Sequence, residues 1–137
     1  MFYHIKIKYD QLTESGKQVT KTEEYLVDNC ELHAEAEDKG YRHIAHYKME
    51  NADITHIKRH SIKEVINSEP EGDYSFYDAT VADIFLTDDG KEKLNKYHIG
   101  LFAKDINDAN AIVNEHMQQG YDMRVIGIKE TKILEIL

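Results

Sequence analysis

A ten-residue stretch near the middle of the chain returns at its end, and this repetition limits how the sequence can fold. Residues 57–66 (IKRHSIKEVI) and 128–137 (IKETKILEIL) share an Ile-Lys pair, an isoleucine five residues after the first isoleucine, and a glutamate followed by a β-branched residue. Such internal similarity is typical of chains that use one supersecondary unit more than once. We therefore expect two related repeats, residues 1–69 and 70–137, that together form one compact domain.

The first repeat reads as strand, strand, helix, strand. Strict alternation of apolar and polar residues over residues 3–10 predicts a half-buried strand, and residues 19–27 predict its antiparallel partner. The turn chemistry of residues 13–17 joins these two strands into a hairpin. Residues 51–53 break the helix that precedes them, and residues 54–59 predict a third strand. The apolar spacing of residues 62–66 fits either a short helical turn or an edge segment.

The helices follow from apolar residues spaced three or four apart. Ala36, Gly40 and Ile44 predict a helix from about residue 32 to 47, and Gly40 indicates close packing because glycine weakens a helix interior by about 1 kcal/mol. In the second repeat the predicted elements are strands at 77–86, 97–103 and 123–129, a hairpin turn at 88–91, and a helix capped by Asp105 or Asn107 and ending at Gly120.

The segment 68–73 holds the single proline together with glycine and charged residues, and it predicts the boundary between the repeats. A three-stranded sheet with one helix leaves a face and edges uncovered, so the two repeats should cover each other. We expect an α+β fold: an internally duplicated strand-strand-helix-strand unit with pseudo-two-fold symmetry, two helices, and one or two largely antiparallel sheets. A homodimer would form if strand edges were left open.

Charge and cysteine content exclude several classes of protein. The net charge of −9 argues against binding to double-stranded nucleic acid, which requires lysine and arginine to neutralise phosphates. The single cysteine, Cys30, cannot form an intramolecular disulfide and fits a reducing, cytoplasmic setting. No apolar run approaches the eighteen residues or so of a membrane span, and no secretion signal is evident.

Five short motifs carry a resemblance to a known family: residues 25–28 (YLVD), 34–37 (AEAE), 53–54 (DI), 57–59 (IKR) and the Gly90-Lys91 turn. Together they resemble an uncharacterised domain-of-unknown-function family of small proteins from Bacteroidota and their bacteriophages. The resemblance covers nearly the whole chain and carries no established activity, cofactor or catalytic residue. It implies an accessory protein of a phage or mobile element that acts in the bacterial host cytoplasm.

The strongest surface signal is a group of basic side chains on two predicted strands. We call this group the basic stripe, and it comprises Lys6, Lys8, Tyr9, His56, Lys58 and His60. If the first and third strands are neighbours, the stripe could bind an anionic small ligand, an acidic partner or single-stranded nucleic acid. The alternative is that lysines on an edge strand only prevent aggregation.

Metal and catalytic motifs are weak. The pairs His43 and His46, and His56 and His60, have spacings that can chelate, but each lacks a third ligand, and Lys58 would oppose a cation. No nucleophile elbow, phosphate-binding loop or zinc-protease motif is present. We therefore predict no metal or cofactor.

Three functions follow, in order of preference. The first is a small non-enzymatic binding protein that acts on a host or phage protein or an anionic small ligand. The second is a factor that binds single-stranded nucleic acid through the basic stripe. The third is a metal-dependent enzyme that uses the histidine pairs.

Overall fold

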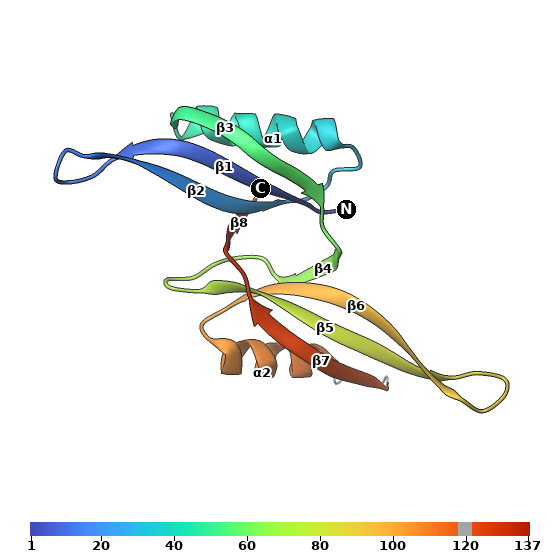
Figure 1. The fold of residues 1–137 in the computed structure, drawn as a ribbon. Coiled ribbons are helices and arrows are strands. Elements are labelled where there is room, and N and C mark those ends of the chain that lie inside the picture. The colour runs from blue at the N-terminus through green and yellow to red at the C-terminus, as the bar shows by residue number, and fades with distance from the viewer. Residues whose placement is uncertain (118–121) are drawn as a thin grey trace. The chain divides into compact units, whose positions relative to one another are not determined.

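A computed structural model describes residues 1–117 and 122–137 of the chain. In this part of the chain, two helices and eight strands form two units, each with a four-stranded sheet and one helix (Figure 1). The first unit contains residues 1–60 and 132–137, and the second contains residues 61–131. The α+β class predicted from the sequence is confirmed. Neither helix in the described residues is long and apolar enough to cross a membrane.

In the first unit, the strands lie in the order β3-β1-β2-β8. Strand β1 is antiparallel to both of its neighbours, and β8 runs parallel to β2. The elements are β1 (Tyr3–Leu12), β2 (Gln18–Val27), α1 (His33–His46), β3 (Glu50–Arg59) and β8 (Ile133–Ile136). The first three of these elements agree with the sequence prediction.

The second unit repeats this order with its own strands. Its sheet has the order β7-β5-β6-β4, in which β5 is antiparallel to both neighbours and β4 runs parallel to β6. The elements are β4 (Ile62–Asn67), β5 (Ser75–Leu86), β6 (Glu92–Ala103), α2 (Ile106–Met117) and β7 (Met123–Glu130). The two sheets therefore match strand for strand, β3 with β7 and β8 with β4.

The two units exchange their fourth strands. In each unit the strand after the helix, β3 or β7, is followed along the chain by a strand that belongs to the sheet of the other unit. Strand β4 follows β3 but pairs with β6, and β8 follows β7 but pairs with β2 (Figure 1). The repeated stretches 57–66 and 128–137 span these two crossings, and their shared isoleucines, Ile62 and Ile133, are only 4% and 5% exposed. The repeated stretches in the sequence therefore coincide with the two crossings between the units.

This exchange moves the unit boundary away from residues 69 and 70. The chain leaves the first unit after His60 and returns to it at Lys132. The segment 68–73, with its proline and glycine, is a connection between β4 and β5 inside the second unit. Turn-forming residues are typical of loops within a unit as well as between units. For this reason the composition of residues 68–73 predicted a loop but did not locate the boundary between the units.

The structure settles two local predictions around β3 and β4. Residues 51–53 follow the end of α1 as expected, but the third strand begins earlier than predicted, because β3 begins at Glu50 and accommodates Asn51 at a positive φ of 51°. Asparagine tolerates this region better than most residues, and its Nδ2 donates to Asp10 Oδ2 at 2.9 Å. Of the alternatives for residues 62–66, the edge segment is correct, as β4, and the helical turn is wrong.

Both predicted hairpin turns are present, and they have the same geometry. Gly16 and Gly90 both have a φ of 79°, a conformation that favours glycine. The amide of Thr13 donates to the Lys17 carbonyl at 2.8 Å, and the amide of Thr87 donates to the Lys91 carbonyl at 2.9 Å. Positions in β1–β2 and β5–β6 therefore correspond at a constant offset of 74 residues.

Each helix covers one face of its sheet and closes a separate apolar core. Helix α1 buries Ala36 and Gly40, and a Cβ atom on Gly40 would lie 2.6 Å from Ile54 Cδ1, so the predicted close packing is confirmed. Helix α2 is capped by Asp105, whose Oδ1 accepts from the Asp108 amide at 2.8 Å. The predicted end of this helix at Gly120 lies outside the described residues.

Replacing Gly100 with alanine should destabilise the second unit. A Cβ atom at Gly100 would overlap the ring of Phe76, which is fully buried and has little room to move. Overpacking of this kind costs about 1–3 kcal/mol. Chemical denaturation of Gly100→Ala and of Gly127→Ala, where an added Cβ meets no atom within 4 Å, provides a matched test. Equal stabilities for the two variants would contradict this packing.

Deleting residues 132–137 should destabilise the first unit selectively, because β2 loses its parallel partner. The deletion removes the buried Ile133 and the bond from the Leu137 amide to the Leu26 carbonyl at 2.8 Å. Burying one isoleucine contributes about 1.5–3 kcal/mol, so we expect a loss of at least that size. Hydrogen exchange should accelerate in β2 and much less in β6. The control Leu134→Ala alters an exposed side chain of the same strand and should leave exchange in β2 unchanged.

Candidate functional site

The structure brings the two strands of the basic stripe together. Strands β1 and β3 are antiparallel neighbours in which Lys6 lies opposite His56 and Lys58 lies opposite His4. Successive side chains of a strand point to opposite faces of the sheet. The alternate residues Ile5 and Ile7 pack in the core with α1, so the lysines of β1 lie on the face away from that helix.

Carboxylates interrupt the basic stripe. Lys6 lies opposite Glu24 of β2, and Lys8 lies opposite Asp53 of β3. Opposite charges at facing positions on two strands reduce the positive potential that an anionic ligand would meet.

His4 lies among the residues of the stripe, although the sequence analysis did not include it. Its Nε2 is 2.8 Å from Glu24 Oε1, and its ring centroid is 5.2 Å from that of His56 and 6.0 Å from that of His60. Burial lowers the pKa of His4, while the hydrogen bond with Glu24 opposes the shift. The alternation of β1 already placed His4 on the same polar face as Lys6, so the signal was present in the sequence.

The histidines do not assemble into a metal site. Among residues 1–117 and 122–137, no group of three or more His, Cys, Asp or Glu side chains has an arrangement that could hold a metal ion. His43 and His46 both lie against Tyr47, with ring centroids 4.7 and 4.8 Å away. Both therefore make ring contacts in the structure.

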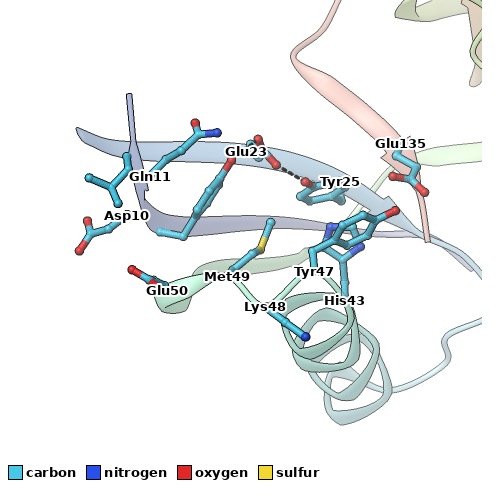
Figure 2. Close-up of a pocket in the computed structure, with 12 residues that line it drawn as sticks. Asp10, Gln11, Glu23, Tyr25, His43, Tyr47, Lys48, Met49, Glu50 and Glu135 are labelled. Atoms are coloured by element: carbon cyan, nitrogen blue, oxygen red, sulfur yellow. Dashed lines mark hydrogen bonds between the residues drawn. The ribbon is translucent and has the colours of Figure 1, made fainter. Parts of the chain in front are cut away.

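Tyr9 lies on the other face of the sheet from the lysines of the stripe. It lines a cavity of 520 Å³ within the first unit, between the sheet and the end of α1 (Figure 2). We call this cavity the tyrosine pocket and define it by Tyr9, Glu23, Tyr25, His43, Tyr47 and Glu135. These residues come from β1, β2, α1 and β8 and from the residue after α1.

Glu23 is the polar centre of the tyrosine pocket. One of its carboxylate oxygens accepts a hydrogen bond from the Tyr9 hydroxyl at 2.6 Å, and the other accepts one from the Tyr25 hydroxyl (Figure 2). Burial and the contact with Glu23 raise the pKa of Tyr9 to about 12 and also raise the pKa of Tyr25. Both phenols therefore keep their protons at neutral pH and act as donors that fix the position of the carboxylate.

Three aromatic rings form one wall of the tyrosine pocket. The ring centroid of His43 lies 4.5 Å from that of Tyr25 and 4.7 Å from that of Tyr47. Burial lowers the pKa of His43, although Glu135 and Glu23 oppose the shift. His43 is therefore neutral at pH 7, and this wall carries no positive charge.

Carboxylates dominate the lining of the cavity. Asp10 and Glu50 lie at one end and Glu135 at the other, with Glu23 between them (Figure 2). Hydrogen bonds from Asn51 and Thr20 lower the pKa of Asp10, so it is ionised at neutral pH. The one ammonium of the lining, that of Lys48, points away from Glu23 and Tyr25.

Among the residues that define the tyrosine pocket, the sequence pointed to Tyr9, as part of the basic stripe, and to His43, as one of a histidine pair. Glu23 and Tyr25 alternate on the inward face of a predicted strand, where a buried acid between tyrosines would have been a usable signal. The position of Glu135 could not have been found in the same way, because β8 reaches β2 only through the strand exchange.

Comparison with known proteins identifies the chain at the level of its family. It belongs to a family described as a domain of unknown function, DUF4494, whose model matches residues 1–137. The resemblance to an uncharacterised family is thus confirmed. Neither a curated protein nor a solved structure matches the chain.

The contribution of Tyr9 to stability should disappear at alkaline pH. Its pKa is 10 in an unfolded chain and about 12 in the folded protein, so folding favours the protonated phenol. The contribution is complete below pH 10 and is lost as the pH rises toward 12. Tyr9→Phe should cost about 1 kcal/mol at pH 8 by removing the bond to Glu23.

This prediction is checked by thermal melts of both proteins between pH 8 and 12. The difference in Tm between the parent and Tyr9→Phe should shrink above pH 10. Tyr74→Phe, a change in the second unit, controls for general alkaline denaturation. A difference that stays constant up to pH 12 would show that Tyr9 does not donate to Glu23.

Proposed function

We propose that this protein is a non-enzymatic binding protein that takes its ligand in the tyrosine pocket. The observation that carries the proposal is the pair of tyrosine hydroxyls that hold the Glu23 carboxylate in place within an open cavity. A charged group with two fixed donors is preorganised, so little conformational entropy is lost when a ligand binds.

The dimensions and lining of the pocket support this role. Its 520 Å³ falls within the range of about 300–1,000 Å³ that is usual for ligand sites. Such sites combine aromatic walls with a few polar groups that orient the ligand. The rings of Tyr25, His43 and Tyr47 supply the wall, and Glu23 supplies the orienting group.

The protonation states favour binding over proton transfer. A general acid or base is most effective when its pKa lies near the working pH. Burial and Glu23 move the pKa of Tyr9 and Tyr25 upward, away from neutrality. Cys30 lies in the same unit, and burial raises the pKa of its thiol, which donates to the Asp28 carbonyl at 3.4 Å. A protonated, buried thiol is a poor nucleophile.

The resemblance to phage and Bacteroidota proteins extends the proposal to biological context. On that basis we propose an accessory protein of a phage or mobile element whose ligand belongs to a host protein. Binding of an anion at the basic stripe is a second candidate, favoured by the pairing of Lys6 with His56 and of Lys58 with His4 on neighbouring strands.

Amide chemical shifts of the ¹⁵N-labelled protein can locate the site. We expect a panel of small cationic, anionic and neutral compounds to include at least one that shifts the amides of Tyr9, Tyr25 and His43 with saturation. The double variant Glu23→Gln/Tyr25→Phe should lose this response.

The stripe variant Lys6→Glu/Lys8→Glu/Lys58→Glu separates the two candidate sites. It changes the opposite face of the sheet, so it should keep the response of the tyrosine pocket. Shifts that gather around His4 and Lys6, and that vanish in the stripe variant, would favour the second candidate. A panel in which no compound perturbs the pocket would overturn the proposal.

A further inference from the structure

We infer that the tyrosine pocket takes an alkylammonium group of the kind that a lysine side chain carries. This inference rests on the proposed function and names the chemical class of its ligand. The ligand expected here is a cation, whereas the basic stripe predicted an anion. The reason is that the pocket lies on the other face of the sheet and is lined by carboxylates.

The lining of the tyrosine pocket is negatively charged. The carboxylates of Asp10, Glu23, Glu50 and Glu135 line the cavity. The lining has one ammonium, that of Lys48, and it points away from Glu23. A cavity with an excess of carboxylates attracts a cation and repels an anion.

The aromatic wall of the tyrosine pocket also suits an ammonium group. A lysine ammonium that lies over the face of a tyrosine ring is attracted by the negative charge of the ring's π face. Tyr25 and Tyr47 lie on either side of the neutral His43, and Glu23 and Glu135 stand beside this wall (Figure 2). Aromatic faces next to carboxylates are the combination that recognises organic ammonium groups.

The second unit contains such an ammonium at the matching place. There Lys63 of β4 holds its Nζ 5.1 Å from the ring centroid of Tyr97. Burial raises the pKa of Tyr97, and the charges of Asp83 and Glu64 add to the shift. One unit of this protein therefore already has a lysine ammonium on a tyrosine ring among carboxylates.

The corresponding positions of the two units can be compared directly. At the offset of 74 residues, Tyr9 corresponds to Asp83, and Glu23 corresponds to Tyr97. Each unit thus has one acid and one tyrosine at these two positions. In the first unit the tyrosine is on β1 and the acid on β2, whereas in the second unit the acid is on β5 and the tyrosine on β6.

The fourth strands have matching registers. Ile133 and Glu135 of β8 pair with Glu24 and Tyr25, just as Ile62 and Glu64 of β4 pair with His98 and Ile99. Glu135 therefore matches Glu64, and the residue that matches Lys63 is Leu134. The first unit also has a tyrosine and carboxylates at these positions but has a leucine where the second unit has its lysine, so a ligand would provide the ammonium.

The ammonium could belong to a free amine or to a lysine in a protein, and one set of probes distinguishes them. The probes are cadaverine and a pentapeptide, acetyl-Gly-Gly-Lys-Gly-Gly-amide, in three forms that carry lysine, acetyl-lysine or norleucine. Acetylation keeps the four-methylene stem of the lysine side chain and removes its charge. Butyrate serves as the anionic probe.

We expect the lysine peptide to bind with saturable shifts at Tyr9, Tyr25 and His43. The acetyl-lysine and norleucine peptides should bind at least about tenfold more weakly, since each loses both the ionic contact and the cation–π contact. If cadaverine binds and the lysine peptide does not, the source is a free amine. Equal affinity for the lysine and acetyl-lysine peptides would overturn the inference.

Variants of the full chain test the residues involved. Glu23→Gln should weaken binding of the lysine peptide, whereas Glu31→Gln, an exposed carboxylate outside the pocket, should leave it unchanged. Leu134→Lys introduces into the first unit the lysine that the second unit has at the matching position. This change should also weaken binding of the peptide, because the new ammonium would compete for the pocket. If Glu23→Gln fails to fold, Leu134→Lys decides, since Leu134 is 52% exposed.

The same data separate this inference from the proposed function. Saturable shifts at the pocket with butyrate alone would reject the ammonium and keep a binding protein. Shifts with none of the probes, together with no response from the wider panel, would reject both.

Discussion

The pairing of the fourth strands is the interaction on which the rest of this structure depends. Strand β8 covers the edge of β2 with parallel backbone bonds, and β4 does the same for β6. The bonds from the Leu137 amide to the Leu26 carbonyl and from the Asp28 amide to the Leu137 carbonyl are 2.8 and 3.0 Å long. Each sheet is completed by a segment that follows the other unit's third strand, so cutting the chain at residue 69 leaves both sheets one strand short. The exchange also carries Glu135 to the tyrosine pocket, and the same pairing therefore supports both the fold and the candidate site.

The two units use one framework for different chemistry. Strand order, hairpin turns and the register of the fourth strand agree between them. Inside that framework the first unit has Tyr9, Glu23 and Leu134 where the second has Asp83, Tyr97 and Lys63. A shared fold does not imply a shared function, because function depends on the side chains placed upon it. The second unit contains its own ammonium on a tyrosine ring, while in the first unit rings and carboxylates line a cavity.

Local patterns in the sequence were sufficient for most elements. The alternation in β1, the glycines at the hairpin turns and the apolar spacing of α1 predicted these elements, because each pattern depends on neighbours within a few residues. The missed elements depend on distant partners. Strand β8 has only four residues, too few for a clear period, and the tertiary structure resolved the alternatives for β4. The third strand begins earlier than the predicted residue 54, at Glu50, because Asn51 adopts a positive φ inside β3.

The sequence by itself determined the α+β class, the two matching sets of elements and the polar face that carries Lys6, Lys8 and Lys58. Alternation along a strand decides which residues share a face, so this information is local. Only the tertiary structure decided which strands complete each sheet and where the tyrosine pocket lies. Tyr9, Tyr25, His43 and Glu135 come from separate elements and from opposite ends of the chain. Their approach depends on long-range packing and strand exchange, and no periodicity in the sequence records which distant side chains will meet.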